Sequence, residues 1–227
     1  MWLDLEDRGI SRSLLLFGNR ELDHKLILEK TLHPGMSVLD IGANIGYYTL
    51  MMLRLIGPNG TLIAVEPSPT NASLLKRNLL LNGHSSIEVH QKAVSEIDGI
   101  QDFFLSEMSN LNTFHNTGTG TKHLSGITIP VETKTVQQIA AGRRIDLIRM
   151  DVEGHEIEVI NGLIPAIENK EMAPAIIFET HLSRYNVDHD MEVPLRRLFS
   201  LGYHLAGVSS SSKRGTTIIE SLGYQGS

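Results

Sequence analysis

The sequence predicts an α/β protein built on a mainly parallel β-sheet with helices on both faces. Short apolar runs rich in valine, isoleucine and leucine alternate along the chain with segments of helical spacing. Strands that are apolar throughout are typical of parallel sheets, because helices cover both faces of such a sheet. Several of these runs also end in an acidic residue. The carboxyl ends of parallel strands are where α/β proteins bind their ligands.

The first half of the chain supplies three predicted strands and two predicted helices. The strands cover residues 37–42, 61–66 and 87–94, and the helices cover residues 44–57 and 68–83. The first helix is expected to stop at Gly57, because Pro58 follows it. The second begins with the capping residue Ser68, has Pro69 at its first position and stops at Gly83.

The second half repeats this alternation and then departs from it. Strands are predicted at residues 144–150, 174–180, 201–208 and 215–221, and a helix is predicted to begin at His155. The last two strands have no helix between them. We therefore expect them to form a hairpin, which would make one edge strand of the sheet antiparallel.

Two segments fall outside the alternation. Residues 95–135 contain the apolar runs "DFFL" and "ITIPVE" on either side of a polar loop. Long loops in compact domains are often functional, so we expect two short strands here and a loop that lies over the active site. Residues 1–34 are expected to form a helical cap over the open end of the sheet. The whole chain, residues 1–227, is predicted to be a single domain.

The composition argues against several classes of protein. The chain has no cysteine, which removes disulfides, thiolate zinc sites and cysteine nucleophiles and suits a cytoplasmic protein. Its start is too charged for a secretory signal, and no apolar run approaches the ~20 residues that span a bilayer. A formal net charge of −6 argues against a nucleic-acid partner. The sequence does not decide between a monomer and a homo-oligomer.

The first predicted strand-to-helix turn has the sequence "LDIGANIGYYT" (39–49). Gly42 and Gly46 would let the backbone turn tightly beside a ligand, but Asn44 stands where the dinucleotide fingerprint has glycine. Glu66 ends the second strand, where it can accept hydrogen bonds from ribose hydroxyls. S-adenosylmethionine carries a cationic sulfonium and no phosphate, so Asp40 and Asn44 suit it better than a pyrophosphate cofactor. The plainer interpretation is a tight turn beside an exposed acid.

Acids and histidines follow the fourth and fifth predicted strands. Asp151 ends the strand that precedes "VEGHE", and Glu179 and His181 end the next strand. Together with His155, these residues are the candidate catalytic groups. An alcohol is a poor nucleophile until its proton leaves, so a general base is expected within hydrogen-bond reach of an acceptor hydroxyl, and any of the four could serve.

Each of these residues also has a plainer interpretation. Asp151 and Glu153 could cap the following helix, because acids bind its free N–H groups and favour its dipole. A zinc-protease HExxH site is excluded, since position 159 is valine. A hard-ion site of Asp151, Glu179 and His181 stays open. The chain has no dedicated ligand loop, however, and no required metal is predicted.

Four motifs, in this order and spacing, resemble the FkbM family of S-adenosylmethionine-dependent O-methyltransferases: "LDIGANIGYYT", "VEPSP", "DVEGHE" and "IIFETH". The resemblance covers roughly residues 30–208, and "SNLNTF" (109–114) also looks like that family's loop. It implies a Rossmann-like class I methyltransferase fold with a seven-stranded sheet. It also implies methyl transfer to a hydroxyl of a sugar, polyketide or other secondary metabolite. The residues that it assigns to the cofactor are Asp40, Gly42, Asn44, Gly46 and Glu66, with adenine near Pro67, Ser68, Ala93 and Val94.

Two other functions stay open at this point. A nucleotide-dependent oxidoreductase on a Rossmann sheet is disfavoured by Asn44. A non-catalytic S-adenosylmethionine-binding module is disfavoured by the acids at four strand ends. The motif after the fourth strand also differs from the Asp/Asn-Pro-Pro-Tyr/Phe motif of enzymes that methylate amino groups of nucleic-acid bases or glutamine. With the negative net charge, this difference argues against a nucleic-acid substrate.

Overall fold

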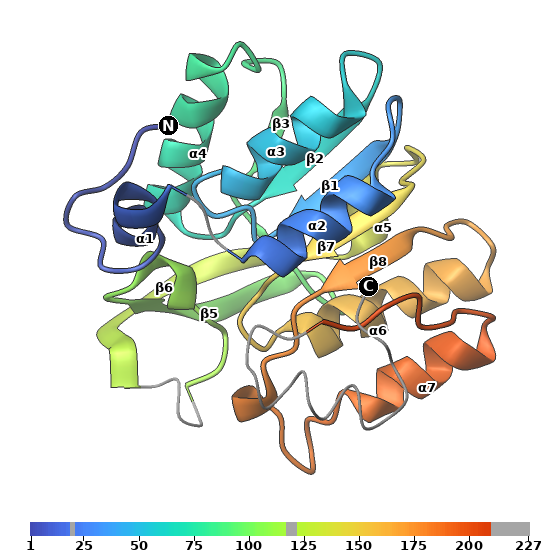
Figure 1. Ribbon diagram of the computed structural model, residues 1–227. Helices are drawn as coiled ribbons and strands as arrows, with labels where there is room; N and C mark the ends of the chain where they lie inside the picture. Colours follow the sequence, from blue (N-terminus) through green and yellow to red (C-terminus); the bar gives the residue numbers. More distant parts are fainter. Residues whose placement is uncertain (19–20, 117–121, 210–227) are drawn as a thin grey trace.

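A five-stranded parallel sheet forms the centre of the computed structural model, which describes residues 1–18, 21–116 and 122–209 (Figure 1). The strands are β1 (Ser37–Ile41), β2 (Thr61–Val65), β3 (Glu88–His90), β7 (Leu147–Met150) and β8 (Ala175–Phe178). Their order is β3-β2-β1-β7-β8, and every neighbouring pair is parallel. The strand order therefore reverses between β1 and β7, and ligands bind at such a reversal in open α/β sheets.

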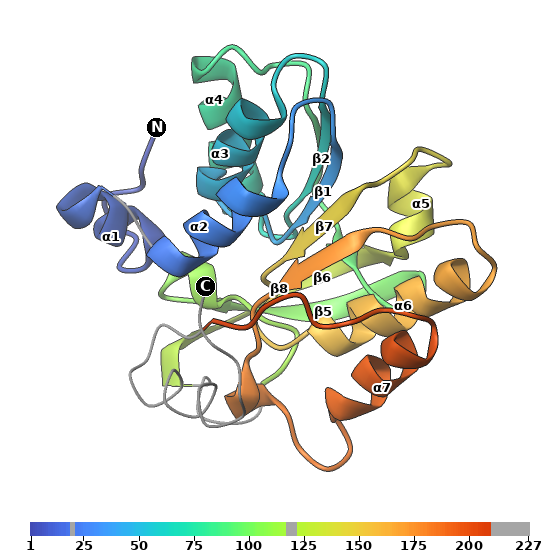
Figure 2. The ribbon, with the colours of Figure 1, turned by 45° about the vertical axis from the view of Figure 1, so that its right-hand side comes forward.

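Helices cover both faces of this sheet (Figure 2). One face packs against α2 (Leu22–Thr31), α3 (Tyr47–Ile56) and α4 (Pro69–Leu81), and the other packs against α5 (Val136–Ala140), α6 (Glu156–Glu168) and α7 (Glu192–Ser200). Successive strand residues point to opposite faces. Val38 therefore packs with Met52 of α3, whereas Leu39 packs in the core that contains Ile160 of α6. The doubly covered sheet that the apolar runs predict is confirmed.

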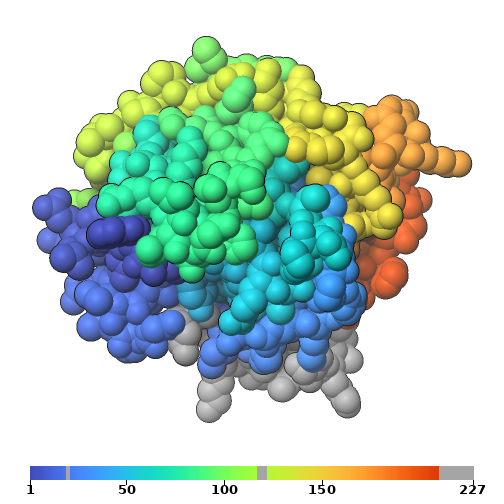
Figure 3. Space-filling view, turned by 90° about the horizontal axis from the view of Figure 1, so that it is seen from above, coloured from blue at the N-terminus to red at the C-terminus, as the bar shows by residue number. Residues whose placement is uncertain are grey.

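The N-terminal segment packs against the turn after β1 and against α4. Helix α1 (Ile10–Phe17) contributes Ile10 and Leu14 to a small core with Ile45. The guanidinium of Arg77 on α4 stacks over the Trp2 ring at 4.5 Å. The space-filling view shows the N-terminal segment beside the surface of α4 (Figure 3). The start of the chain thus lies beside the carboxyl-end region of β1.

A second, smaller sheet has the order β4-β6-β5. It consists of β4 (Ala93–Val94), β5 (Gly99–Ser106) and β6 (Leu124–Lys134), with β5 antiparallel and β4 parallel to β6. A short 3₁₀ turn, η1 (Ser109–Leu111), follows β5. Residues 95–135 thus hold the two strands predicted there, both longer than expected.

The described residues form a five-stranded sheet and a separate three-stranded sheet, and not the single seven-stranded sheet that was predicted. The run 87–94 divides, because Ala93 and Val94 leave the main sheet and pair with Thr133 and Lys134. Residues 201–208 form no strand, and most of them are exposed, so they lack the burial that favours a central strand. The predicted strand at 215–221 lies outside the described residues. The antiparallel pairing that occurs is β5 with β6, not a C-terminal hairpin.

Helix boundaries differ from the sequence expectation by a few residues. Helix α3 starts at Tyr47, because Asn44 and Gly46 take positive φ values of 51° and 92° that end the turn before the helix can begin. Helix α4 begins after the Ser68 cap with Pro69 in its first turn, as predicted. In the described part of the chain, none of the helices has the length and apolarity needed to cross a membrane.

Candidate active site

One cavity of about 310 Å³ lies at the carboxyl ends of the central strands. Its wall combines the ends of β1, β2, β7 and β8 with β4, with the segment 109–114 and with residues near α1 and α2. Ten of the sequence-predicted site residues line it: Gly42, Asn44, Glu66, Pro67, Ala93, Val94, Asp151, His155, Glu179 and His181. Asp40, Gly46 and Ser68 do not. The topological reversal between β1 and β7 therefore brings most of the predicted residues to one place.

The turn after β1 contains three residues with positive φ, and Gly42 and Asn44 are the two that line the cavity. Gly42 has φ +78°, and a Cβ atom there would lie 2.1 Å from the carbonyl oxygen of Asp151, so no side chain fits. Asn44 has φ +51°, and its Oδ1 atom accepts the N–H of Ile45 at 2.8 Å. An asparagine tolerates this left-handed conformation because its short polar side chain bonds locally. The turn thus packs directly against the residue that ends β7.

Glu66 lies at the end of β2 and is buried. It accepts hydrogen bonds from the backbone N–H groups of Asn44 at 2.8 Å and Ser68 at 3.0 Å, and from the Asn71 amide at 3.4 Å. Burial raises the pKa of Glu66 to about 7, against the opposing effect of these hydrogen bonds. A carboxylate has roughly four acceptor positions, so Glu66 keeps capacity for a further donor in the cavity.

The cavity wall beside Glu66 is largely apolar. Pro67, Ala93, Val94 and Phe103 line this part. Ser68 does not reach it, because its hydroxyl instead accepts the N–H of Asn71 at the start of α4. This end of the cavity can take a flat, mostly apolar group with a polar edge near Glu66.

Arg149 forms the floor between β1 and β7 and is 2% exposed. Its guanidinium donates to Asp40 at 3.3 Å, to the Gly42 carbonyl at 3.2 Å and to Asp151 at 3.0 Å. Asp40 is fully buried below the cavity, where Thr49 also donates to it at 2.6 Å. Burial raises the pKa of Asp40, and the charge of Arg149 opposes that rise. The acid of the glycine-rich turn therefore anchors Arg149 and does not line the cavity.

Sequence reasoning did not identify Arg149. The sequence did contain a signal for it. Arg149 is the only charged residue in the apolar strand "LIRM", and it stands two positions before Asp151. A charge inside a strand that is buried on both faces needs a partner of opposite sign, and Asp40 on the neighbouring strand supplies one.

An aromatic side chain covers Arg149 from the cavity side. The guanidinium lies 4.7 Å from the centre of the Tyr48 ring. The Tyr48 hydroxyl donates to Glu21 at 2.8 Å, and the His24 ring stacks on Tyr48 with ring centres 4.5 Å apart. Burial and the Arg149 charge lower the pKa of His24 to about 4. Residues near α2 thus complete the wall, a contribution that the spacing of the motifs could not specify.

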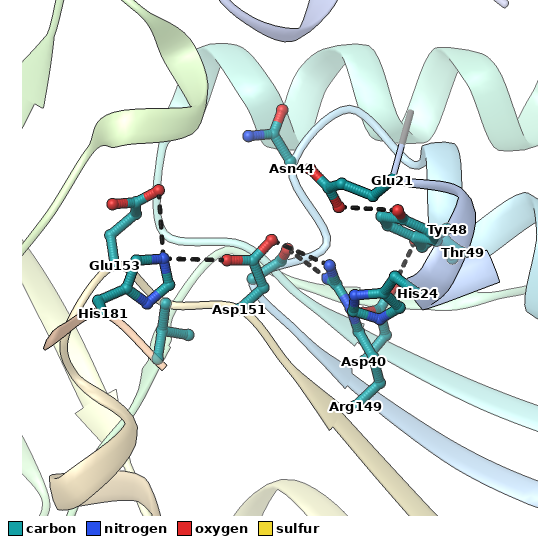
Figure 4. Close-up of polar contacts among 12 residues, drawn as sticks. Glu21, His24, Asp40, Asn44, Tyr48, Thr49, Arg149, Asp151, Glu153 and His181 are labelled. Carbon is teal, nitrogen blue, oxygen red and sulfur yellow. Dashed lines mark hydrogen bonds and ion pairs between the residues drawn. The ribbon is translucent and has the colours of Figure 1, made fainter. Parts of the chain in front are cut away.

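His181 lies among three carboxylates. Its Nδ1 atom is 2.8 Å from Glu156, and its Nε2 atom is 3.6 Å from Glu153 and 3.8 Å from Asp151. Burial alone would lower the pKa of His181, but its interactions with Glu153 and Glu156 outweigh burial and raise the pKa to about 11. His181 is therefore an imidazolium at neutral pH. Figure 4 shows the resulting row of alternating charges, from Glu153 through His181, Asp151 and Arg149 to Asp40.

Glu179 lines the same end of the cavity. Burial of its carboxyl and the nearby charge of Asp151 raise the pKa of Glu179 to about 7, although part of the residue is exposed to solvent. One ligand atom from each of Asp151, Glu179 and His181 lies within 4.8 Å of the other two. The hard-ion arrangement considered from sequence is therefore sterically present, but its histidine carries a positive charge of its own.

His155 is 3% exposed and precedes the first residue of α6. Its Nε2 atom is 3.0 Å from the Ser95 hydroxyl, and its ring packs on Phe114 with centres 4.5 Å apart. Burial lowers the pKa of His155 to about 3, which makes it a weak base. Asp151 and Glu153 do not cap α6, whose N-cap residue is His155 and has no side-chain cap hydrogen bond. Glu156 accepts the N–H groups of Val152 and Gly154 instead.

The segment "SNLNTF" (109–114) closes the cavity opposite the sheet. The Ser109 carbonyl accepts from the Asn71 amide at 3.1 Å and from the Asn44 amide at 3.4 Å. The Ser109 N–H in turn donates to Asp7 at 2.9 Å. Segments at residues 7, 44, 71 and 109 are thus connected around the end of the cavity that holds Glu66.

Comparisons with known proteins place the chain among methyltransferases by similarity. A family model described as the "Methyltransferase FkbM domain" matches residues 40–205. "Methyltransferase 1" of Beauveria bassiana is 28% identical over 56% of this chain and 57% of its own length. "Protein-L-isoaspartate O-methyltransferase" of Caenorhabditis elegans is 29% identical over 60% and 58%. "Methyltransferase sdnD" of Sordaria araneosa is 28% identical over 63% and 65%.

The chain spans about three fifths of the length of these curated relatives. Among solved structures, an FkbM methyltransferase from Methylobacillus flagellatus is 16% identical, with a TM-score of 0.48 over 71% of this chain and 37% of that one. The family model covers most of the sequence, from the aspartate of the first strand to beyond α7. The chain belongs to the FkbM methyltransferase family.

Proposed function

We propose that this chain is an S-adenosylmethionine-dependent O-methyltransferase that transfers a methyl group to a hydroxyl of a sugar, polyketide or other secondary metabolite. The observation that supports this function most directly is the cavity itself. One end is apolar and carries Glu66, and the other carries Glu179 among Asp151 and His181. The two ends suit a nucleoside and an acceptor hydroxyl respectively, with the methyl group passing between them.

The charge of the wall favours this cofactor over a nucleotide with a pyrophosphate. Five carboxylates line the cavity, at Glu21, Glu66, Asp151, Glu153 and Glu179, while Arg149 is already paired with two acids. A pyrophosphate would face these acids, whereas a sulfonium is attracted to them. Glu66 would hold the ribose, the apolar wall would hold the adenine, and the turn from Gly42 to Asn44 would border the rest of the cofactor.

When bound, S-adenosylmethionine supplies an electrophilic methyl group on a sulfonium. The residues of this chain must then orient the acceptor and accept its proton. We assign the proton to Glu179, because its raised pKa of about 7 makes it a stronger base than an ordinary glutamate. Asp151 accepts from Arg149 and faces His181, so it is the positioning residue beside the base. His181 is already protonated and cannot serve as a base.

The same acids argue for a neutral acceptor. Some relatives are named protein-L-isoaspartate O-methyltransferases, which would imply a carboxylate acceptor. Here such an acceptor would approach Asp151, Glu153 and Glu179, and like charges at close range repel. A hydroxyl brings no charge and can donate a hydrogen bond to Glu179. We therefore propose a hydroxyl acceptor and no nucleic-acid partner.

Two measurements test the proposal. In a thermal shift experiment, S-adenosylmethionine and its demethylated product should raise the Tm, whereas NADH should not. Transfer of label from methyl-labelled S-adenosylmethionine into a panel of glycosides and polyketides should then identify acceptors, with an isoaspartyl peptide as the carboxylate comparison. Absence of any shift with either cofactor form would overturn cofactor binding. A shift without transfer to any acceptor would favour a binding module.

We also propose that transfer needs no divalent metal at Asp151, Glu179 and His181. The imidazolium of His181 already supplies positive charge among these acids. Adding Mg²⁺ to chelator-treated protein should leave the transfer rate unchanged. A rate that rises saturably with Mg²⁺ would show that the ion-binding alternative is correct.

A further inference from the structure

A second cluster of histidines and a carboxylate lies beside Phe114, at the start of α6. One ligand atom from each of His115, His155 and Glu158 lies within 4.8 Å of the other two. The rings of His115 and His155 have centres 5.6 Å apart. This cluster shares no residue with the group formed by Asp151, Glu179 and His181.

Each of the three side chains carries a buried polar atom without a hydrogen-bond partner. These atoms are Nε2 of His115, Nδ1 of His155 and Oε2 of Glu158. Buried polar atoms in folded proteins are paired in the great majority of cases, because an unpaired one loses its hydration without replacement. Only 3% of His155 is exposed to solvent, so bulk water does not easily supply a hydrogen bond to its Nδ1 atom. Three unpaired ligand atoms in one cluster call for a shared partner.

The spacing of these atoms fits a metal ion. Nδ1 of His155 and Oε2 of Glu158 are 3.4 Å apart and form no hydrogen bond. Ligand atoms ~2.0–2.2 Å from a tetrahedral zinc ion lie roughly 3.4 Å from each other. The observed separation is therefore the one that two ligands of a single ion would have.

The outer contacts of the cluster are also those of a metal site. Histidine ligands usually hold their second ring nitrogen in a hydrogen bond, which fixes the ring. Nε2 of His155 is 3.0 Å from the Ser95 hydroxyl, and the His115 ring bonds to the backbone of Gly154. Nε2 of His189 is 2.9 Å from the other oxygen of Glu158. Each proposed ligand is thus oriented by a neighbour, with its unpaired atom left toward the cluster.

We propose that His115, His155 and Glu158 bind a divalent transition-metal ion, with zinc as the best fit. Two imidazoles and one carboxylate are typical ligands of zinc and its first-row neighbours, whereas Mg²⁺ and Ca²⁺ prefer oxygen ligands throughout. The ion connects the segment after η1 to the first turn of α6. Phe114, which lines the substrate cavity, precedes one ligand and packs on another. The site therefore fixes one wall of the cavity without taking part in methyl transfer.

Metal content measured by mass spectrometry tests this site. Protein stripped with a chelator, incubated with Zn²⁺ and dialysed should retain about one zinc ion per chain. Glu158→Gln is nearly isosteric and should lose it, as should His115→Ala. Ser95→Ala, which removes only the outer contact of His155, should weaken zinc binding by ~10–100-fold. Co²⁺ in place of zinc should give the visible spectrum of a low-coordinate site in wild type and not in Glu158→Gln.

Two controls separate this site from other histidines and acids. His33→Ala removes an exposed histidine outside the cluster and should keep the zinc. Glu179→Gln removes a carboxylate of the other candidate group and should also keep it. Circular dichroism confirms that each variant is folded. Wild type without retained zinc, or zinc retained in both Glu158→Gln and His115→Ala, would overturn the proposal. Loss in Glu179→Gln with retention in Glu158→Gln would do the same.

Discussion

The two ends of the cavity, where we propose that the cofactor and the acceptor bind, hold their acids in different ways. At the cofactor end, Glu66 is held by two backbone N–H groups and an amide, all within a few residues of the first two strand ends. At the acceptor end, Asp151 lies between two cations, Arg149 and His181. The first arrangement leaves hydrogen-bonding capacity for a neutral sugar. The second fixes a pattern of charge, and Glu179 lies beside it, with a carboxylate oxygen within 4.8 Å of ligand atoms of Asp151 and His181.

This difference suggests that the Glu66 end of the cavity controls cofactor binding and that the Glu179 end controls proton transfer. Acids held by neutral donors contribute to binding, because those contacts exist before and after the reaction. An acid with a raised pKa next to paired charges contributes to proton transfer, which occurs in the transition state alone. The following substitutions separate the two roles.

Glu179→Gln should have the largest effect. Loss of a general base lowers turnover by ~10²–10⁴-fold, while cofactor affinity stays close to wild type. In wild type the rate should rise as pH passes about 7, because Glu179 must be deprotonated to accept the proton. Turnover measured against pH checks both statements. Glu29→Gln, an exposed glutamate on α2, is the matched control. An unchanged pH profile in Glu179→Gln would assign the base elsewhere.

Arg149→Met should have the next largest effect, a loss in the free energy of unfolding. It removes the cation between Asp40 and Asp151 and leaves a fully buried carboxylate without its charge partner. Breaking a buried pair in this way costs ~3–5 kcal/mol of unfolding free energy. Urea unfolding measures it, with Arg144→Met as control, because Arg144 is largely exposed and surface changes stay within ~0.5 kcal/mol. Similar losses in both variants would contradict the buried-pair argument.

His181→Gln should show a pH-dependent loss of stability. The folded pKa of His181, about 11, lies above the ~6.5 of an unfolded histidine. Its stabilising effect is therefore complete below pH ~6.5 and is lost as pH rises toward 11, by at most ~1.4 kcal/mol per pH unit. Unfolding of wild type and variant between pH 6 and 10 should give a difference that shrinks with pH. His33→Gln should give none. A constant difference would mean that His181 is not charged.

Glu66→Gln should have the smallest effect, confined to the cofactor. Hydrogen bonds to a charged acceptor contribute ~1.5–3 kcal/mol, so the Kd for S-adenosylmethionine should rise by roughly 10- to 150-fold. Turnover at saturating cofactor should stay near wild type. Calorimetry gives the affinity, and Glu96→Gln, an exposed glutamate, is the control. A fall in saturated turnover without a change in Kd would reverse the roles of the two ends.

The cofactor end was the more predictable from sequence. Gly42, Asn44 and Glu66 act through contacts set by one turn and two adjacent strands, so their spacing carries the information. The parallel sheet was equally readable from its apolar runs. The number of strands in the main sheet could not be predicted. Residues 93–94 pair with residues 133–134 in the second sheet, and a short apolar run does not indicate which sheet it will join.

The acceptor end depends on contacts between distant segments. Arg149 bonds to Asp40 across 109 positions, and His181 bonds to Glu156 across 25. No spacing rule links such pairs. His155 and His181 looked equivalent in the sequence, yet one is neutral beside Ser95 and Phe114 and the other is cationic among carboxylates. Their burial and partners, which only the fold supplies, decide the charge.

The buried pair of Arg149 and Asp40 also determines how the cavity responds to salt. Mobile ions weaken interactions between exposed charges beyond a Debye length of ~8 Å at physiological ionic strength, but they screen buried pairs much less. Arg149 and Asp40 are 2% and 0% exposed. The electric field that they set beneath the cavity is therefore insulated from the surrounding electrolyte, and so is the orientation of Asp151 that depends on it.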